Sequence, residues 1–227
     1  MSGRDRILGK LKRSLGRDGL DVNAVAAVER RLASRKPNLV PKRAERPHAE
    51  QVDLFIEKAT SLDISVARVG GLADVPGAIA DYLAEHNLPS EIKMSPDAAL
   101  DGVPWAERPM LKIARGRAEI SDAVGVTPAF RAIAETGTLV TVSSAERPTT
   151  LNFVPDDHVV VLKASQVVGT MEDMWAGLRN DRGDGDMPRT VNMISGPSRT
   201  ADIQLTLIKG AHGPRRLHIV LVDDGAA

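Results

Sequence analysis

The sequence has no cysteine among its 227 residues. Disulfide bonds are therefore excluded, and so are cysteine-ligated zinc and iron–sulfur sites within this chain. Long apolar runs are also lacking, because no stretch approaches the ~20 residues that a membrane-spanning helix needs. The N-terminal residues do not form the apolar segment of a secretion signal. We therefore expect a cytoplasmic protein with no membrane span.

Aromatic residues are scarce at 3%, whereas 42% of the residues are hydrophobic. The core must consist mostly of Val, Ile, Leu and Ala, which suits buried parallel strands covered by helices. Strand-like and helix-like segments alternate with short connections, which predicts an α/β domain with a mostly parallel central sheet. The expected strands are 64–69, 91–94, 110–114, 122–129, 138–143, 158–164, 190–195 and 215–223. The expected helices are 3–17, 22–34, 48–62, 73–87, 129–135 and 170–179, with another that starts within 200–210.

The net charge is zero, but the two signs are unevenly distributed along the chain. Residues 1–47 contain 13 Lys/Arg and 5 Asp/Glu, whereas residues 48–227 contain 17 and 25. Segment 3–17 places apolar and basic side chains on opposite faces of a helix. The Pro-rich, basic segment 35–47 is typical of a linker. We therefore predict a basic helical arm with its linker at 1–47 and an α/β domain at 48–227.

The basic arm has two interpretations. It could fold back onto the acidic domain by charge complementarity, or it could dock an acidic partner, a membrane surface or nucleic acid. We favour the first interpretation, or a protein partner, because the arm lacks the aromatic side chains that alternate with basic ones in single-stranded nucleic-acid binding. No nucleic-acid partner is expected.

The first candidate site is the segment VGVTPAFRAIAETGTLV (124–140), in which Glu135 lies between an expected helix and an expected strand. Gly137 supplies the backbone freedom that this reversal needs. The hydroxyls of Thr136 and Thr138 can hydrogen-bond backbone or a ligand. A helix C-terminus disfavours negative charge, and locally unfavourable residues concentrate at functional sites. Glu135 is therefore a candidate catalytic residue, and the alternative is a solvated carboxylate near a helix end.

The second candidate is the segment ISGPSRTADIQ (194–204). A strand is followed by a Gly-Pro pair, and Ser198 or Thr200 can cap the helix expected after it. The free N–H groups of a helix start, together with Arg199 and the hydroxyls, can hold a phosphate or carboxylate. Asp202 would oppose that anion or shape the loop, and every element also has a structural explanation. The candidate ligand-binding residues here are Gly196, Pro197, Ser198, Arg199, Thr200 and Asp202.

The third candidate is the segment KGAHGPRR (209–216), in which His212 lies between Gly210 and Gly213. A histidine between glycines has little apolar cover, so His212 is a candidate acid/base or anion ligand, with Gly213 beside it. No two histidines have the i, i+4 spacing of a helical metal site, so no metal is expected. The sequence also contains neither a G-x-S-x-G nor a G-x-G-x-x-G pattern.

These segments together resemble the LUD-domain family, specifically the lactate utilisation protein C type. The resemblance is carried by VGVTPAFRAIAETGTLV, by SGPSRTADIQLTLIKGAHGPRRLHIVLVD and by PDDHVVVL between them, and it extends to the N-terminal RDRILGKLKRSL. It implies a fold similar to the NagB/RpiA/CoA-transferase group, a Rossmann-like three-layer α/β sandwich. The motif positions that it carries over are Glu135, Thr136, Gly137, Thr138, Gly196, Pro197, Ser198, Thr200, Ala201, Asp202, His212, Gly213 and Pro214.

The resemblance also implies a role in oxidising L-lactate to pyruvate, as one subunit of a three-component iron–sulfur oxidoreductase system. The clusters would belong to the partner proteins, and no cofactor is expected within this cysteine-free chain. On this hypothesis the chain binds a small carboxylate or another anionic ligand in a cleft at the carboxyl edge of the sheet. Glu135, Asp202, His212 and Arg199 would line that cleft, and Glu135 or His212 would move the hydroxyl proton.

Two other hypotheses remain open from the sequence. The chain could be a stand-alone enzyme or binding protein for a phosphorylated or CoA-linked small molecule, with Glu135 as base or nucleophile. It could also be an assembly or regulatory module that docks through the basic arm.

Overall fold

A computed structural model describes residues 2–16, 21–183, 185–200 and 208–225. The chain divides into two compact units, Met1–Leu39 and Val40–Ala227. Ala44 lies at the end of the expected linker, yet it is buried within the second unit. No helix among the described residues is both long enough and apolar enough to cross a membrane.

The N-terminal unit contains two helices, α1 (Gly3–Ser14) and α2 (Val22–Ser34). Ser2 and Asp5 form a reciprocal capping box at the start of α1, and Asp21 accepts a hydrogen bond from the Ala24 N–H at the start of α2. Such caps satisfy N–H groups that have no partner inside a helix. Neither helix has a buried residue, so both rest on local interactions within this unit.

The second unit is built around a six-stranded sheet in which every neighbouring pair of strands is parallel. This confirms the mostly parallel central sheet expected from the alternating pattern. Its strands are aliphatic and buried on both faces at the centre, as parallel strands between layers must be. In spatial order they are β1 (Ser65–Val69), β12 (Arg216–Val222), β7 (Asp157–Lys163), β4 (Val124–Pro128), β2 (Glu91–Met94) and β3 (Lys112–Arg115).

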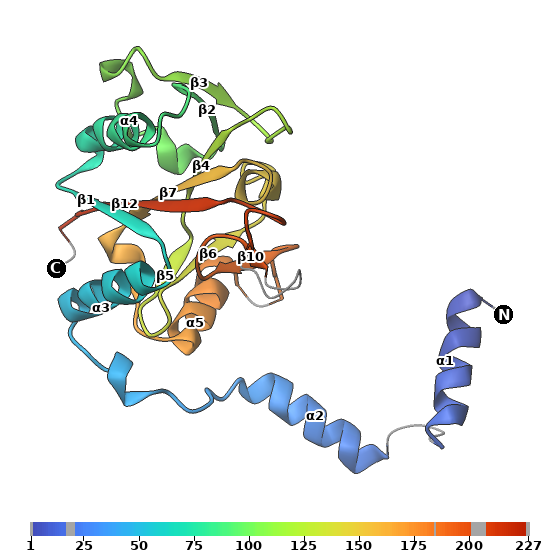
Figure 1. Ribbon diagram of the computed structural model, residues 1–227. Helices are drawn as coiled ribbons and strands as arrows, with labels where there is room; N and C mark the ends of the chain where they lie inside the picture. Colours follow the sequence, from blue (N-terminus) through green and yellow to red (C-terminus); the bar gives the residue numbers. More distant parts are fainter. Residues whose placement is uncertain (1, 17–20, 184, 201–207, 226–227) are drawn as a thin grey trace. The chain divides into compact units, whose positions relative to one another are not determined.

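Helices α3 (His48–Ser61) and α4 (Val75–Glu85) lie on opposite sides of this sheet (Figure 1). On the α4 side, Ile79 and Leu83 pack against alternate residues of the central strands such as Val126. On the α3 side, Phe55 packs against the residues of opposite parity, among them Val160. Successive side chains of a strand point to opposite faces, so the same central strands contribute residues to the core on the α3 side and to the core on the α4 side.

A second, four-stranded sheet completes the layer on the α3 side. Its order is β8 (Val167–Val168), β5 (Arg131–Ile133), β6 (Thr138–Val142) and β9 (Val191–Ile194). Helix α5 (Met171–Arg182) covers its outer face through Met174 and Leu178. A two-stranded ribbon, β10 (Arg199–Thr200) with β11 (Ile208–Lys209), follows. The short 3₁₀ helices are η1 (Lys42–Ala44), η2 (Leu72–Asp74), η3 (Ala98–Leu100), η4 (Trp105–Glu107), η5 (Thr149–Asn152) and η6 (Ala164–Gln166).

The prediction of a helix at 129–135 is wrong. Arg131–Ile133 is strand β5, which pairs antiparallel with β6 and parallel with β8. The apolar run was compatible with either structure, because β5 is buried by α5 on one face and by the α3-side core on the other. Pairing with two neighbouring strands overrides the helix propensity of its alanines.

The prediction of a helix that starts within 200–210 is wrong where the structure describes this segment. Arg199 and Thr200 pair antiparallel with Lys209 and Ile208. Thr200 is therefore a strand residue, and the positions after it, where the helix of the anion cradle was expected, lie outside the described residues. Asp202 lies outside the described residues, as does Ala201.

Candidate functional site

Two motif glycines pack against the end of helix α3. Gly137 has φ +65°, and a β-carbon there would lie 2.7 Å from the Ala59 nitrogen and 2.7 Å from the Lys58 carbonyl carbon. Gly196 has φ +113°, and a β-carbon there would lie 2.7 Å from the Leu62 oxygen. Both positions need the backbone freedom and the small size of glycine. They bring the β5–β6 hairpin and the segment after β9 to the same end of α3.

Three hydroxyls join these two segments. Thr136 Oγ1 lies 2.8 Å from Thr138 Oγ1, which lies 2.8 Å from Ser195 Oγ. Each hydroxyl can both donate and accept, so both hydrogen bonds in this series of three hydroxyls can form at once. The first and second motifs are therefore in contact, although about sixty positions separate them in the sequence. Thr138 links the two segments through Ser195, and Thr136 bonds Thr138 within the first segment.

Glu135 is located at the start of a helix, not at the end of one. It lies in the β5–β6 hairpin, is 9% exposed, and its Oε1 accepts a hydrogen bond of 2.9 Å from the Met171 N–H. Met171 is the first residue of α5, where a carboxylate is favoured by the helix dipole. The expected placement at a helix C-terminus is wrong because 129–135 is not a helix. A capping role accounts for the position of this acid.

The second and third motifs enclose a pocket of about 250 Å³, here called the loop pocket. Ser198 fixes its wall, because its N–H donates to the Pro214 oxygen and its Oγ accepts from the His212 N–H. Most of the lining is apolar, with a few polar groups, as small-molecule sites usually are. The lining residues are Asn152, Phe153, His158, Ile194, Gly196, Pro197, Ser198, Arg199, His212, Gly213, Pro214 and Leu217.

His158 is a buried polar residue of the loop pocket, as is Asn152. It is 0% exposed, and its Nε2 lies 2.8 Å from Thr127 Oγ1. Its Nδ1 is also buried and has no hydrogen-bond partner among the described residues. Burial lowers the pKa of His158 to about 4, so the imidazole is neutral at pH 7. Two other histidine nitrogens, His48 Nδ1 and His218 Nε2, are likewise buried without a partner, so this feature alone does not mark a ligand position.

Arg199 is already engaged at the rim of the loop pocket. It donates to the Leu62 oxygen at 2.9 Å and lies 3.3 Å from the Asp63 carboxylate, which also pairs with Lys209. The pKa of Asp63 is held below its usual value, first by the hydrogen bond from Lys209 and then by the charges of Lys209 and Arg199. Arg199 therefore ties the β10–β11 ribbon to the α3–β1 turn.

The loop pocket lies at the amino ends of the parallel strands, which corrects the expected position at their carboxyl ends. His158 is the second residue of β7, and it is opposite Leu217, the second residue of β12. The structure brings Gly196, Pro197, Ser198, Arg199, His212 and Gly213 together around this pocket. It does not bring Glu135, Thr136, Gly137, Thr138 or Thr200 into the lining.

Buried polar side chains continue from the loop pocket between the two sheets. Asn152 Nδ2 donates to Thr141 Oγ1 at 2.9 Å, and Asn192 Nδ2 reaches the same oxygen at 3.3 Å. Thr127 and Thr141 come from the facing strands β4 and β6. Sequence reasoning missed this group because Thr127, Thr141 and Asn192 each interrupt a strand singly, and Asn152 lies in the short helix η5. A threonine or histidine inside an otherwise aliphatic strand was the available signal.

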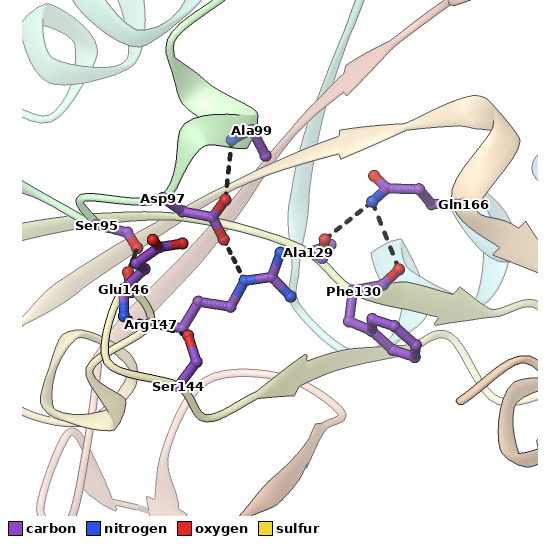
Figure 2. Close-up of polar contacts among 9 residues, drawn as sticks. All are labelled: Ser95, Asp97, Ala99, Ala129, Phe130, Ser144, Glu146, Arg147 and Gln166. Atoms are coloured by element: carbon purple, nitrogen blue, oxygen red, sulfur yellow. Dashed lines mark hydrogen bonds and ion pairs between the residues drawn. The ribbon is translucent and has the colours of Figure 1, made fainter. Parts of the chain in front are cut away.

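A second polar group lies at the carboxyl ends of β2 and β4 (Figure 2). The Asp97 carboxylate pairs with Arg147 Nε and accepts from the Ala99 N–H at 2.9 Å. Ser95 Oγ donates to the Glu146 oxygen at 2.6 Å. None of these residues was a sequence candidate, since they lie outside the three motif segments. Among the described residues, no group of three or more His, Cys, Asp or Glu could hold a metal ion.

Comparison with known proteins was consistent with the motif resemblance. The family model described as LUD domain matches residues 52–222. Lactate utilization protein C of Shouchella clausii (strain KSM-K16) is 35% identical over 108 residues, 48% of this chain and 47% of that protein. Lactate utilization protein C of Exiguobacterium sp. (strain ATCC BAA-1283 / AT1b) is 40% identical over 102 residues, 44% of each chain. The matched region thus spans about half the length of these relatives.

A solved structure has the same fold. A crystal structure of a DUF162 family protein from Deinococcus radiodurans superposes with a TM-score of 0.55 and 24% sequence identity. The match covers 78% of this chain and 99% of that chain. It supports the Rossmann-like α/β architecture, with a parallel sheet between layers, that the resemblance implied.

Proposed function

Since this chain belongs to the LUD domain family, we propose that it acts in the utilisation of L-lactate, as the cluster-free component of an iron–sulfur-dependent system that oxidises lactate to pyruvate. Relatives named lactate utilization protein C support the pathway. The absence of cysteine supports a division of labour, because cysteine-ligated clusters must then be on partner subunits.

The loop pocket is the proposed site for the small carboxylate. The observation that carries this proposal is the convergence of the second and third motifs on one pocket, whose lining includes His158 and His212. The hydroxyl of Ser198 and the imidazole of His212 line this pocket and offer polar contacts to the carboxylate and the C2 hydroxyl of lactate.

Oxidation of lactate removes a proton from the C2 hydroxyl and a hydride, or its equivalent, from C2. His212 lines the pocket and is the proposed acceptor of the hydroxyl proton. The electron pair passes to an acceptor on a partner subunit. Glu135 is proposed to position the β5–β6 hairpin through its bond to Met171, and its predicted catalytic role stays a prediction.

Deletion of the gene for this chain is expected to abolish growth on L-lactate as sole carbon source. Growth on pyruvate should be unchanged, because pyruvate is the product of the proposed oxidation and enters metabolism beyond the lost step. Growth rates of the deletion strain on the two carbon sources provide the measurement. Restoration by the wild-type gene is the control, and normal growth of the deletion strain on lactate would contradict the proposal.

A further inference from the structure

A second cleft lies at the carboxyl ends of the central strands, at the end of the sheet away from the loop pocket. The proposed lactate site does not include it. It measures about 500 Å³ and is here called the carboxyl-edge cleft. In α/β sheets, ligands usually bind beyond the carboxyl ends of the strands. The lining residues are Ala129, Phe130, Arg131, Val142, Arg147, Gln166, Asp181, Arg182 and Asp186.

Arg147 is held in place from two sides. Its Nε pairs with the Asp97 carboxylate, whose residue is 4% exposed and whose other oxygen accepts from the Ala99 N–H. Its backbone belongs to a turn closed by the Arg147 N–H and the Ser144 oxygen at 3.2 Å. The same turn is anchored to the end of β2 by the hydrogen bond from Ser95 Oγ to the Glu146 oxygen. The guanidinium is therefore preorganised.

The terminal nitrogens of Arg147 remain available. Figure 2 shows the side chain extending from its turn toward Ala129 and Phe130. The carbonyl oxygens of these two residues already accept from Gln166 Nε2 at 2.9 and 3.4 Å. Neither Nη1 nor Nη2 of Arg147 has a hydrogen bond to any residue in the described part of the chain. The side chain is 30% exposed, so these donors face the cleft.

The remaining charges of the cleft pair with one another. Arg131 bonds Asp181 at 2.8 Å, and Arg182 lies 3.8 Å from Asp186. Within the described part of the chain, Arg147 forms one ion pair, with Asp97 through its Nε. An arginine fixed in this way presents two parallel N–H groups, which match two oxygens of a carboxylate or phosphate.

We propose that the carboxyl-edge cleft binds a small oxyanion, a carboxylate or a phosphate, through the two terminal nitrogens of Arg147. Asp97 and Ser95 position the guanidinium, and the open cleft admits either a free anion or an anionic group on a larger molecule. This site is distinct from the loop pocket, and the proposal does not depend on a role in lactate utilisation.

The test is a set of NMR titrations of the full chain at constant ionic strength, with sodium chloride as the blank. The probes are inorganic phosphate, methyl phosphate and L-lactate. At least one probe should shift the Arg147 Nε–H resonance and saturate. Phosphate, phosphate monoester and carboxylate ligands are distinguished by which probe binds most tightly. The imidazole resonances of His158 report separately on the loop pocket, so failure of one site is distinguishable from failure of the other.

Variants locate the effect. Arg147→Lys keeps a cation opposite Asp97 but loses the two parallel N–H groups of the guanidinium. We therefore expect the dissociation constant of the anion to rise at least about tenfold, which corresponds to the loss of one charged hydrogen bond. Arg189→Gln removes an exposed arginine outside the cleft and should leave binding unchanged. The proposal is overturned if no probe shifts Arg147, or if a folded Arg147→Lys protein binds as tightly as the wild type.

Discussion

Replacing Gly137 with alanine should lower the free energy of unfolding by roughly 2 to 5 kcal/mol. The residue has φ +65°, a conformation that costs alanine energy, and its β-carbon would meet the backbone of α3 at 2.7 Å. Backbone atoms on both sides are fixed by the helix and by the hairpin, so the contact cannot be relieved by a side-chain rotation. Urea unfolding of the full chain measures the effect.

Gly71→Ala is the matched control for this substitution. Gly71 has φ −176°, which any residue adopts, and no atom lies within 4 Å of its β-carbon position. Its stability should change by less than about 0.5 kcal/mol. Equal unfolding midpoints for the two variants would refute the packing role of Gly137. The ligand-binding role expected from the motif would then be the better explanation of this glycine.

Asp157→Ala should cost about 3 kcal/mol of stability, because it removes a fully buried carboxylate that binds the Tyr82 hydroxyl and the half-exposed Arg216 guanidinium. Asp157 is 0% exposed and accepts from Arg216 at 2.6 and 2.7 Å and from the Tyr82 hydroxyl at 2.7 Å. Burial first, and the hydrogen bond to Asp157 second, raise the pKa of Tyr82 well above its usual value, so the phenol stays protonated and donates. The variant leaves both donors without an acceptor.

The neighbouring acid supplies the control. Asp156 has a side chain that is 61% exposed and lies 3.6 Å from Arg215. An exposed pair of this kind contributes little, so Asp156→Ala should change the unfolding free energy by less than about 0.5 kcal/mol. The two variants are one position apart, and they differ in burial and in the hydrogen bonds that the lost carboxylate makes. A similar loss in both would mean that the Asp157 network does not stabilise the sheet.

Much of the parallel sheet could be predicted because its strands carry an unambiguous pattern. The runs that become β7 and β12 are continuous and aliphatic, as strands buried on both faces are. The segment that becomes β5 is only three residues long and begins with Arg131, and the alanines within and around it favour a helix. This segment is a strand because it pairs with β6 and β8, and local sequence does not show that pairing.

The candidate site was predictable in part for a related reason. The second and third motifs enclose one pocket because the short β10–β11 ribbon joins them. Glu135 was misplaced because its location depends on α5, which begins thirty-six positions later. His158 and Arg147 acquire their importance from burial and from distant partners, Thr127 and Asp97. Tertiary contacts of this range leave no local signal.

The most direct test of the loop pocket is complementation of the deletion strain on L-lactate with two variants of equal abundance. Glu135→Gln should restore growth, since an amide oxygen can still accept from the Met171 N–H. His212→Ala should not, although its backbone N–H can still donate to Ser198 Oγ and hold the loop. The reverse result, with His212→Ala growing and Glu135→Gln failing, would contradict the account and place the proton-transferring group at the glutamate.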